Sequence, residues 1–178
     1  MKIFSLIFSL MFIFFISGCI AENHNISYSD IESETEMMKR FAQGSGIIDS
    51  TIPRDVSAGK GSRVEFALAV KKSAENENYD YFGICVGTPD SDNCKAPGQE
   101  PVKVSGDLSG INFLFAPVVK IKNVGDVARF AALMEVPQDA KTGSHSFRFF
   151  VCSLEKPSEV CESPEDAIGY FDFDVNVK

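Results

Sequence analysis

Apolar residues recur at every second position through most of the chain after residue 46, and this period constrains the fold more than any other feature. A period of two belongs to a β-strand with one buried face, because successive side chains point to opposite sides. The alternation is clearest in residues 64–70, 119–121 and 171–177. Further strands are predicted in apolar segments separated by Gly, Pro, Asn and Asp, at residues 79–86, 111–115, 127–136 and 145–152.

No segment after residue 46 keeps the 3.6-residue period of a helix. About seven to eight short strands joined by short breaks are typical of two antiparallel sheets that pack face to face. The sequence therefore predicts an all-β antiparallel sandwich over residues 47–178.

Residues 1–18 have the organisation of an export signal. Lys2 precedes an apolar run at residues 3–16, and Ser17 and Gly18 then lead to Cys19. The run is shorter than the roughly 20 residues that a membrane-spanning helix prefers. An ordinary cleaved signal peptide and an uncleaved anchor are the alternatives that the pattern leaves open.

Residues 16–19, Ile-Ser-Gly-Cys, resemble the lipobox of prokaryotic lipoprotein signal peptides, with Ile16 where leucine is commoner. The resemblance implies that the signal is cut before Cys19 and that the sulfur of Cys19 carries a diacylglycerol. We therefore expect a chain that membrane lipid anchors through Cys19 in the cell membrane, facing the extracytoplasmic side.

Residues 19–46 are polar and acidic, as expected of a tether between the anchor and the strand region. Ser29 and Glu32 have the spacing of a capping box, and apolar residues follow at helical spacing, which predicts a short helix at residues 30–43. This helix either docks on the folded body or a partner, or belongs to a loosely ordered stalk. Asn25 begins an Asn-Ile-Ser sequence that fits the glycosylation acceptor pattern.

Residues 56–59, Val-Ser-Ala-Gly, come shortly before the strand at 64–70, and residues 136–143, Val-Pro-Gln-Asp-Ala-Lys-Thr-Gly, lead into the strand at 146–149. Both patterns resemble the immunoglobulin-like adhesion and CARDB-type modules of prokaryotic surfaces. The resemblance implies an immunoglobulin-like β-sandwich and a surface role for residues 47–178. It carries over no catalytic residue.

Five cysteines leave four to pair if Cys19 carries lipid. Eight residues separate Cys85 from Cys94, and eight separate Cys152 from Cys161. Local disulfides Cys85–Cys94 and Cys152–Cys161 are the simplest connectivity, since a Cys85–Cys152 bridge between antiparallel neighbours would need a long reach. A four-thiolate zinc site is disfavoured by the long spacing and by the oxidising surroundings of an exported chain. We expect no metal and no cofactor.

The loops at residues 87–95 and 153–163 are candidate binding segments, because rigid scaffolds commonly carry function on their connections. The candidate binding residues are polar side chains of these loops: Asp90, Asp92, Asn93, Glu155, Lys156 and Glu159. The chain has 17 Lys and Arg against 25 Asp and Glu, which argues against a nucleic-acid partner. We expect a protein or glycan partner at the cell surface.

Carboxylates offer two further alternatives. Asp90 and Asp92, with Asp80 or Glu100, could supply oxygen ligands to Ca²⁺. Asp172 and Asp174 share one strand face and, with Asp80, are candidate acid and base groups of an exported hydrolase. The prediction that we prefer is a lipid-anchored β-sandwich used for binding or for cell-envelope structure, without catalysis.

Overall fold

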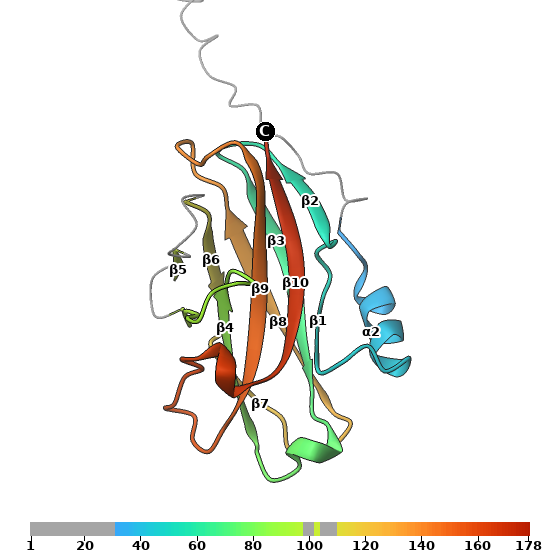
Figure 1. The fold of residues 1–178 in the computed structure, drawn as a ribbon. Coiled ribbons are helices and arrows are strands. Elements are labelled where there is room, and N and C mark those ends of the chain that lie inside the picture. Colours follow the sequence, from blue (N-terminus) through green and yellow to red (C-terminus); the bar gives the residue numbers. More distant parts are fainter. Residues whose placement is uncertain (1–30, 98–101, 104–109) are drawn as a thin grey trace, which may run out of the picture.

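The protein is represented by a computed structural model, which describes residues 31–97, 102–103 and 110–178. Within these residues the chain forms two stacked β-sheets with one α-helix at their side (Figure 1). The expected signal segment, Cys19, Asn25, Ser29 and Glu100 lie outside the described residues.

The first sheet contains five strands in the order β1-β3-β8-β6-β5, and all neighbours in it are antiparallel. Its strands, in sheet order, are β1 (Ile48–Ser50), β3 (Arg63–Lys71), β8 (Val127–Glu135), β6 (Asn112–Phe115) and β5 (Val102–Lys103). The strands predicted at 64–70, 111–115 and 127–136 are all present here, with ends shifted by at most one residue.

The second sheet has the order β2-β10-β9-β4-β7. Its strands are β2 (Asp55–Ala58), β10 (Ala167–Val177), β9 (Gly143–Leu154), β4 (Tyr81–Gly87) and β7 (Val118–Lys120). The expectation of a wholly antiparallel fold is wrong for one pair, because β2 runs parallel to β10. These two strands are far apart in the sequence, so no hairpin dictates their relative direction.

The strand orders β1-β3-β8-β6 and β10-β9-β4 correspond to the A-B-E-D and G-F-C orders of the immunoglobulin fold. The prediction of an all-β sandwich is thus confirmed. The structure describes more strands than expected, since β1, β2 and β5 are too short for a two-residue period to be visible in the sequence.

Phenylalanine rings from both sheets fill the space between them. Phe113 of β6 meets Phe147 of β9 edge to face, with ring centroids 5.0 Å apart. Phe149 stacks on Phe173 of the neighbouring β10 at 5.4 Å. Burying each ring contributes about 1.5–3 kcal/mol, and such ring pairs add about 0.5–1.5 kcal/mol. This core supports the strands from which the candidate loops extend.

Helix α2 (Glu34–Ala42) packs on the outer face of the first sheet. Met37 and Phe41 are buried and contact Ala69 of β3. The helix begins after Ser33, whose hydroxyl accepts a hydrogen bond from the backbone N–H of Glu36. It is therefore shorter than the predicted 30–43. Among the described residues, no helix is long and apolar enough to cross a membrane.

An arginine attaches the same helix to the edge strand β1. Arg40 donates from Nε to Asp49 Oδ2 at 2.7 Å and from Nη2 to the carbonyl of Ser50 at 2.7 Å, and it also pairs with Glu32. Asp49 is almost fully buried, so this contact leaves the helix little freedom. The alternative of a loosely ordered stalk is wrong for this segment, which belongs to the folded body.

Candidate binding surface

The candidate loops extend from two neighbouring strands of the second sheet, β4 and β9. Their pairing register places Cys85 opposite Phe150 and Gly83 opposite Cys152. These positions face outward, away from the phenylalanine core, because they alternate with core residues along each strand. Cys85 and Cys152, the first cysteine of each pair, therefore point to the same outer face of the sheet.

The structure joins Cys85 to Cys94 and Cys152 to Cys161, with Cα atoms 5.5 Å apart in each pair. Cys85 and Cys152 are diagonal neighbours on adjacent strands, because each lies opposite a residue two positions from the other. Diagonal positions are about 7–8 Å apart, beyond the usual Cα separation in a disulfide, which agrees with the expectation that a Cys85–Cys152 bridge would need a long reach. The sulfur atoms of Cys85 and Cys161, which belong to different disulfides, are 3.4 Å apart. The two disulfides therefore touch.

A second, smaller apolar cluster forms around the disulfides on this outer face. Its buried members are the four cysteines together with Phe150 and Leu154 of β9. Tyr81 and Val118 pack against them from β4 and β7. The two loops thus lie side by side over the outer face of the second sheet. We call them together the paired-loop surface and define it as residues 88–95 and 155–163.

Two glycines allow the loops to lie against the sheet. A Cβ atom at Gly83 would come within 3.0 Å of the backbone nitrogen of Cys161, and one at Gly87 within 2.9 Å of the carbonyl oxygen of Asn93. Any larger residue would push the loops outward. The outward positions of β4 read Gly-Cys-Gly in the sequence, a signal of close approach that the sequence analysis missed.

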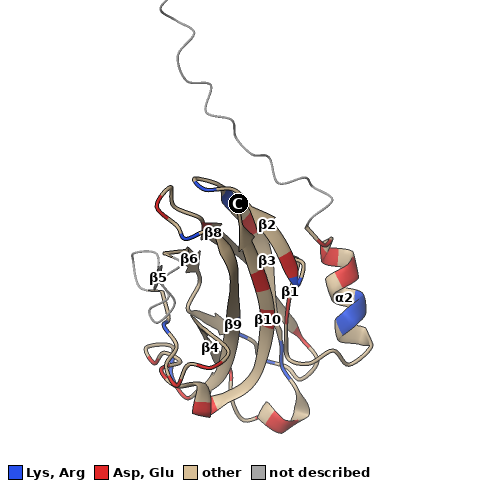
Figure 2. Cartoon of the chain, turned by 45° about the horizontal axis from the view of Figure 1, so that its top comes forward, with Lys and Arg blue, Asp and Glu red and all other residues tan. Residues whose placement is uncertain are grey.

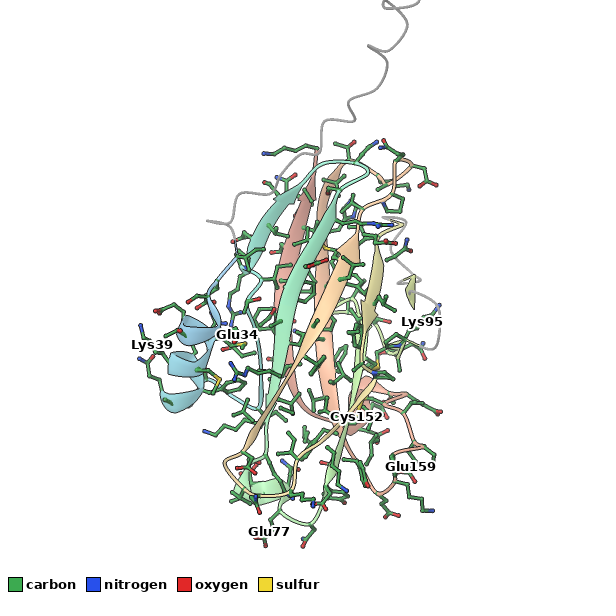
Figure 3. The ribbon with its side chains drawn as sticks, turned by 180° about the vertical axis from the view of Figure 1, so that it is seen from behind. Glu34, Lys39, Glu77, Lys95, Cys152 and Glu159 are labelled. Atoms are coloured by element: carbon green, nitrogen blue, oxygen red, sulfur yellow. A yellow bond between two sulfur atoms is a disulfide. The ribbon has the colours of Figure 1, made fainter. Side chains whose placement is uncertain are left out.

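The structure divides the predicted binding residues into two kinds. Asp90, Asp92, Asn93, Glu155 and Lys156 are exposed on the paired-loop surface. Lys95 of the first loop and Glu159 of the second lie on the same side of the molecule, away from Glu34 and Lys39 of helix α2 (Figure 3). Exposed side chains of both loops are thus available to one partner.

Glu159, the sixth predicted binding residue, stabilises the loop by hydrogen bonds within it. Its carboxylate accepts hydrogen bonds from the backbone N–H groups of Glu155 at 3.0 Å and Lys156 at 3.3 Å. These bonds close the loop that follows β9. Glu159 therefore shapes the paired-loop surface more than it adds a free carboxylate to it.

Arg148 of β9 lies beside this surface, opposite Asp172 of β10. Its Nη2 donates to Asp172 Oδ2 at 2.7 Å, and its Nε also bonds the same carboxylate. The guanidinium carbon is 4.0 Å from the ring centroid of Tyr170, whose side chain is 58 % exposed. The hydrogen bonds to Asp172 raise the pKa of Arg148 against the opposing effect of partial burial, and the charge of Asp90 adds to the rise.

Acidic residues continue along β10 and the neighbouring β2, as Figure 2 shows. Asp174 is opposite Asp55 in the pairing register and accepts a hydrogen bond from the hydroxyl of Ser146. Asp172 is held by Arg148. The two carboxylates proposed for a hydrolase are therefore both engaged with neighbouring side chains.

The third carboxylate of that hypothesis, Asp80, lies just before β4, at the opposite end from Asp174. It forms an ion pair with Lys72, with Nζ 3.1 Å from Asp80 Oδ1. Lys72 is only 1 % exposed and also donates to the carbonyl of Lys122 at 2.9 Å. Asp80 thus helps satisfy a buried ammonium group and does not join Asp172 and Asp174. A pocket that gathers these three carboxylates is absent from the described residues.

An open groove of about 760 Å³ lies between the end of β9 and the loop that follows it. Its lining includes Tyr79, Ser153, Glu159, Glu162 and Asp166, together with the Cys152–Cys161 disulfide. Its lining combines acidic and apolar side chains, and residues 158–162 of the paired-loop surface form part of it.

In the part of the chain that the structure describes, one group of potential metal-ligating residues is close enough to share an ion: Cys85, Cys94 and Cys161. Asp90 and Asp92 form no such group with Asp80, because β4 separates them. The calcium hypothesis is therefore wrong for Asp90 and Asp92 together with Asp80, and its alternative with Glu100 lies outside the described residues.

Sequence reasoning missed the roles of Arg148 and Tyr170. Alternation placed Asp172 on one strand face, but its contact with Arg148 depends on the register between β9 and β10. Neither strand carries a local pattern that specifies this register.

No protein-family model matches the sequence, and no curated protein matches it either. Among solved structures, the chain is similar to a C. elegans MSP family member at 7 % identity and a TM-score of 0.40, covering 75 % of this chain and 99 % of the other. It is also similar to the GspB Siglec domain at 13 % identity and a TM-score of 0.41, and this match covers 74 % of this chain and 56 % of the other.

A third similar structure is AggA, the major subunit of aggregative adherence fimbriae type I from Escherichia coli, at 9 % identity and a TM-score of 0.39, with 75 % and 94 % covered. TM-scores of this size describe a general likeness between β-sandwiches. Such a likeness assigns no function to this chain.

Proposed function

We propose that this protein is an exported, lipid-anchored binding module, which holds a protein or glycan partner at the cell surface and performs no catalysis. The observation that carries the proposal is the contact between the two disulfide-closed loops. The Cys85 and Cys161 sulfurs are 3.4 Å apart, so loops from distant parts of the sequence form one continuous surface. Rigid, preformed surfaces lose less conformational entropy when they bind.

The exposed residues of this region have the chemistry of a recognition surface. Tyr170 and Arg148 lie beside the loops, and tyrosine and arginine are enriched where proteins bind partners. Asp90, Asp92 and Glu155 add exposed negative charge. This combination suits a partner that presents cationic or hydrogen-bond-donating groups, as basic protein segments and hydroxyl-rich glycans both do.

The proposed location rests on the beginning of the chain and on the disulfides. Residues 16–19 resemble a lipobox, and lipid on Cys19 would hold the protein at the membrane. Disulfides form and persist in oxidising compartments outside the cytoplasm, which supports export.

The experiment compares three versions of the full chain in the membranes of their host, treated with a surface cross-linker and analysed by mass spectrometry. One is the wild type, one carries Asp92→Lys and Glu155→Lys on the paired-loop surface, and the matched control carries Glu65→Lys and Asp139→Lys elsewhere. All four acidic residues are exposed. We expect the wild type and the control to retain the same cross-linked partner and the loop variant to lose it.

A glycan array probed with the same three proteins tests for a carbohydrate partner. Binding by the wild type and the control, with loss in the loop variant, would support a glycan. Equal binding by all three proteins in both experiments would contradict the paired-loop surface as the binding site.

A further inference from the structure

Three of the four cysteines on the outer face place their sulfur atoms close enough to share one ion, and the fourth is bonded to one of these three. The sulfurs of Cys85, Cys94 and Cys161 all lie within 4.8 Å of one another, and Cys152 is bonded to Cys161. In a tetrahedral zinc–thiolate site with Zn–S distances of about 2.3 Å, sulfur atoms are about 3.8 Å apart. The contact of 3.4 Å between Cys85 and Cys161 is already close to that separation.

The loops are also held in place by contacts that do not involve sulfur. Val86 and Lys95 exchange two backbone hydrogen bonds, of 3.0 and 2.9 Å, which keep Cys94 beside Cys85. Cys161 rests against Gly83, and the carboxylate of Glu159 closes the loop before it. These contacts do not depend on the two sulfur–sulfur bonds, and they favour a reduced chain in which the cysteines stay near one another.

The surroundings of the sulfurs favour a soft metal ion. All four cysteines are buried, and Phe150 and Leu154 line the cluster. Neither histidine nor a carboxylate belongs to the group of potential ligands among the described residues. Thiolate-only sites prefer Zn²⁺ and Cu⁺ and discriminate against Ca²⁺ and Mg²⁺.

From this geometry we propose that the reduced protein binds one Zn²⁺ ion through Cys85, Cys94, Cys152 and Cys161. Each disulfide takes up two electrons and two protons from a dithiol reductant, which becomes a disulfide itself. Zn²⁺ then displaces the four thiol protons and binds the four thiolates. Thiol–disulfide exchange with two molecules of a disulfide oxidant, each of which takes up two electrons and two protons and becomes a dithiol, converts the four thiolates to two disulfides and releases the ion. The metal-bound and disulfide-bonded forms therefore exclude each other.

This inference does not depend on the partner proposed above. It assigns a second means of closing the same two loops, by metal in the reduced chain and by disulfides in the oxidised chain. Within each pair, the eight residues between the cysteines are more than the two to four of common zinc motifs, which argued against a zinc site when each pair was taken alone. The sheet register brings the two pairs together.

The test uses the full chain with Cys19→Ser, so that the four cysteines are its only thiols. The protein is reduced anaerobically with a dithiol, the reductant is removed, and Zn²⁺ is titrated in competition with a chromophoric chelator. We expect one ion per chain and protection of all four thiols from alkylation. Substitution of Co²⁺ is expected to give the sulfur-to-metal charge-transfer bands of a tetrahedral thiolate site.

Two variants in the same loop separate ligation from loop integrity. Cys94→Ser removes a ligand and is expected to weaken Zn²⁺ binding at least tenfold, whereas Asp92→Asn changes an exposed neighbour and is expected to leave it unchanged. Equal affinity in the Cys94→Ser protein, or a stoichiometry well below one, would overturn the proposal.

Folding of the reduced protein is followed by circular dichroism. If reduction unfolds the chain, Zn²⁺ is added while the dithiol is still present. Recovery of the β-strand signal on addition of Zn²⁺ then supports the site. Failure of Zn²⁺ to restore that signal overturns it.

Discussion

Arg148 and Asp172 are opposite each other on adjacent strands, joined by two hydrogen bonds, and the exposed ring of Tyr170 lies against the guanidinium group. The pair orders the outer face of the second sheet next to the paired-loop surface. Cross-strand pairs of opposite charge stabilise sheets, and a fork-shaped arginine contact also sets the orientation of both side chains.

The strength of this pair is measured by a double-mutant cycle with Arg148→Met and Asp172→Asn. Both side chains are partly exposed, so we expect a coupling free energy of only about 1 kcal/mol in chemical unfolding. A coupling free energy near zero would show that the pair orients Tyr170 without stabilising the fold.

Substitution of Gly83 by alanine is expected to destabilise the protein by about 1–3 kcal/mol. The new methyl group would come within 3.0 Å of the backbone nitrogen of Cys161, which has no room to move because its side chain is covalently bonded. Amide hydrogen exchange should increase in residues 155–163. Ser144→Ala, at an exposed strand position, is the control and should change little. Unchanged exchange in the Gly83→Ala protein would contradict the close approach.

Arg40→Met is expected to cost about 3 kcal/mol of unfolding free energy, because it leaves the buried carboxylate of Asp49 without its main partner. Amide exchange in helix α2 should rise by more than in the core strands. Lys39→Met is the matched control, since Lys39 has an exposed side chain and pairs only with Glu36 among the described residues. Equal effects of the two substitutions would indicate that apolar contacts alone hold the helix.

Labelling of growing cells with a fatty-acid analogue tests the proposed anchor. The wild type should incorporate the label and fractionate with membranes, whereas Cys19→Ala should not be labelled, because it lacks the sulfur to which the lipid would be attached. Equal labelling of both proteins would exclude Cys19 as the lipid site. Retention of the unlabelled variant in membranes would favour the alternative of an uncleaved anchor.

Local sequence was sufficient for the strands whose alternation covers seven or more residues, such as β3 and β10. It was also sufficient for the choice of disulfide partners, since short loops bring Cys85 to Cys94 and Cys152 to Cys161. It was insufficient for β1, β2 and β5, which are short and depend on neighbouring strands for their hydrogen bonds.

The sequence by itself determined that the strands are amphipathic, with phenylalanine and valine on one side of each strand and polar or small residues on the other. Burial of one face is favourable wherever the strands lie, so periodicity predicts a sandwich without specifying which strands are neighbours. The tertiary structure decided that β4 and β9 are adjacent with Cys85 opposite Phe150. That register unites two separate loops into one surface and brings the sulfurs of two disulfides into contact, because pairing between strands distant in sequence is set by the packing of the whole core.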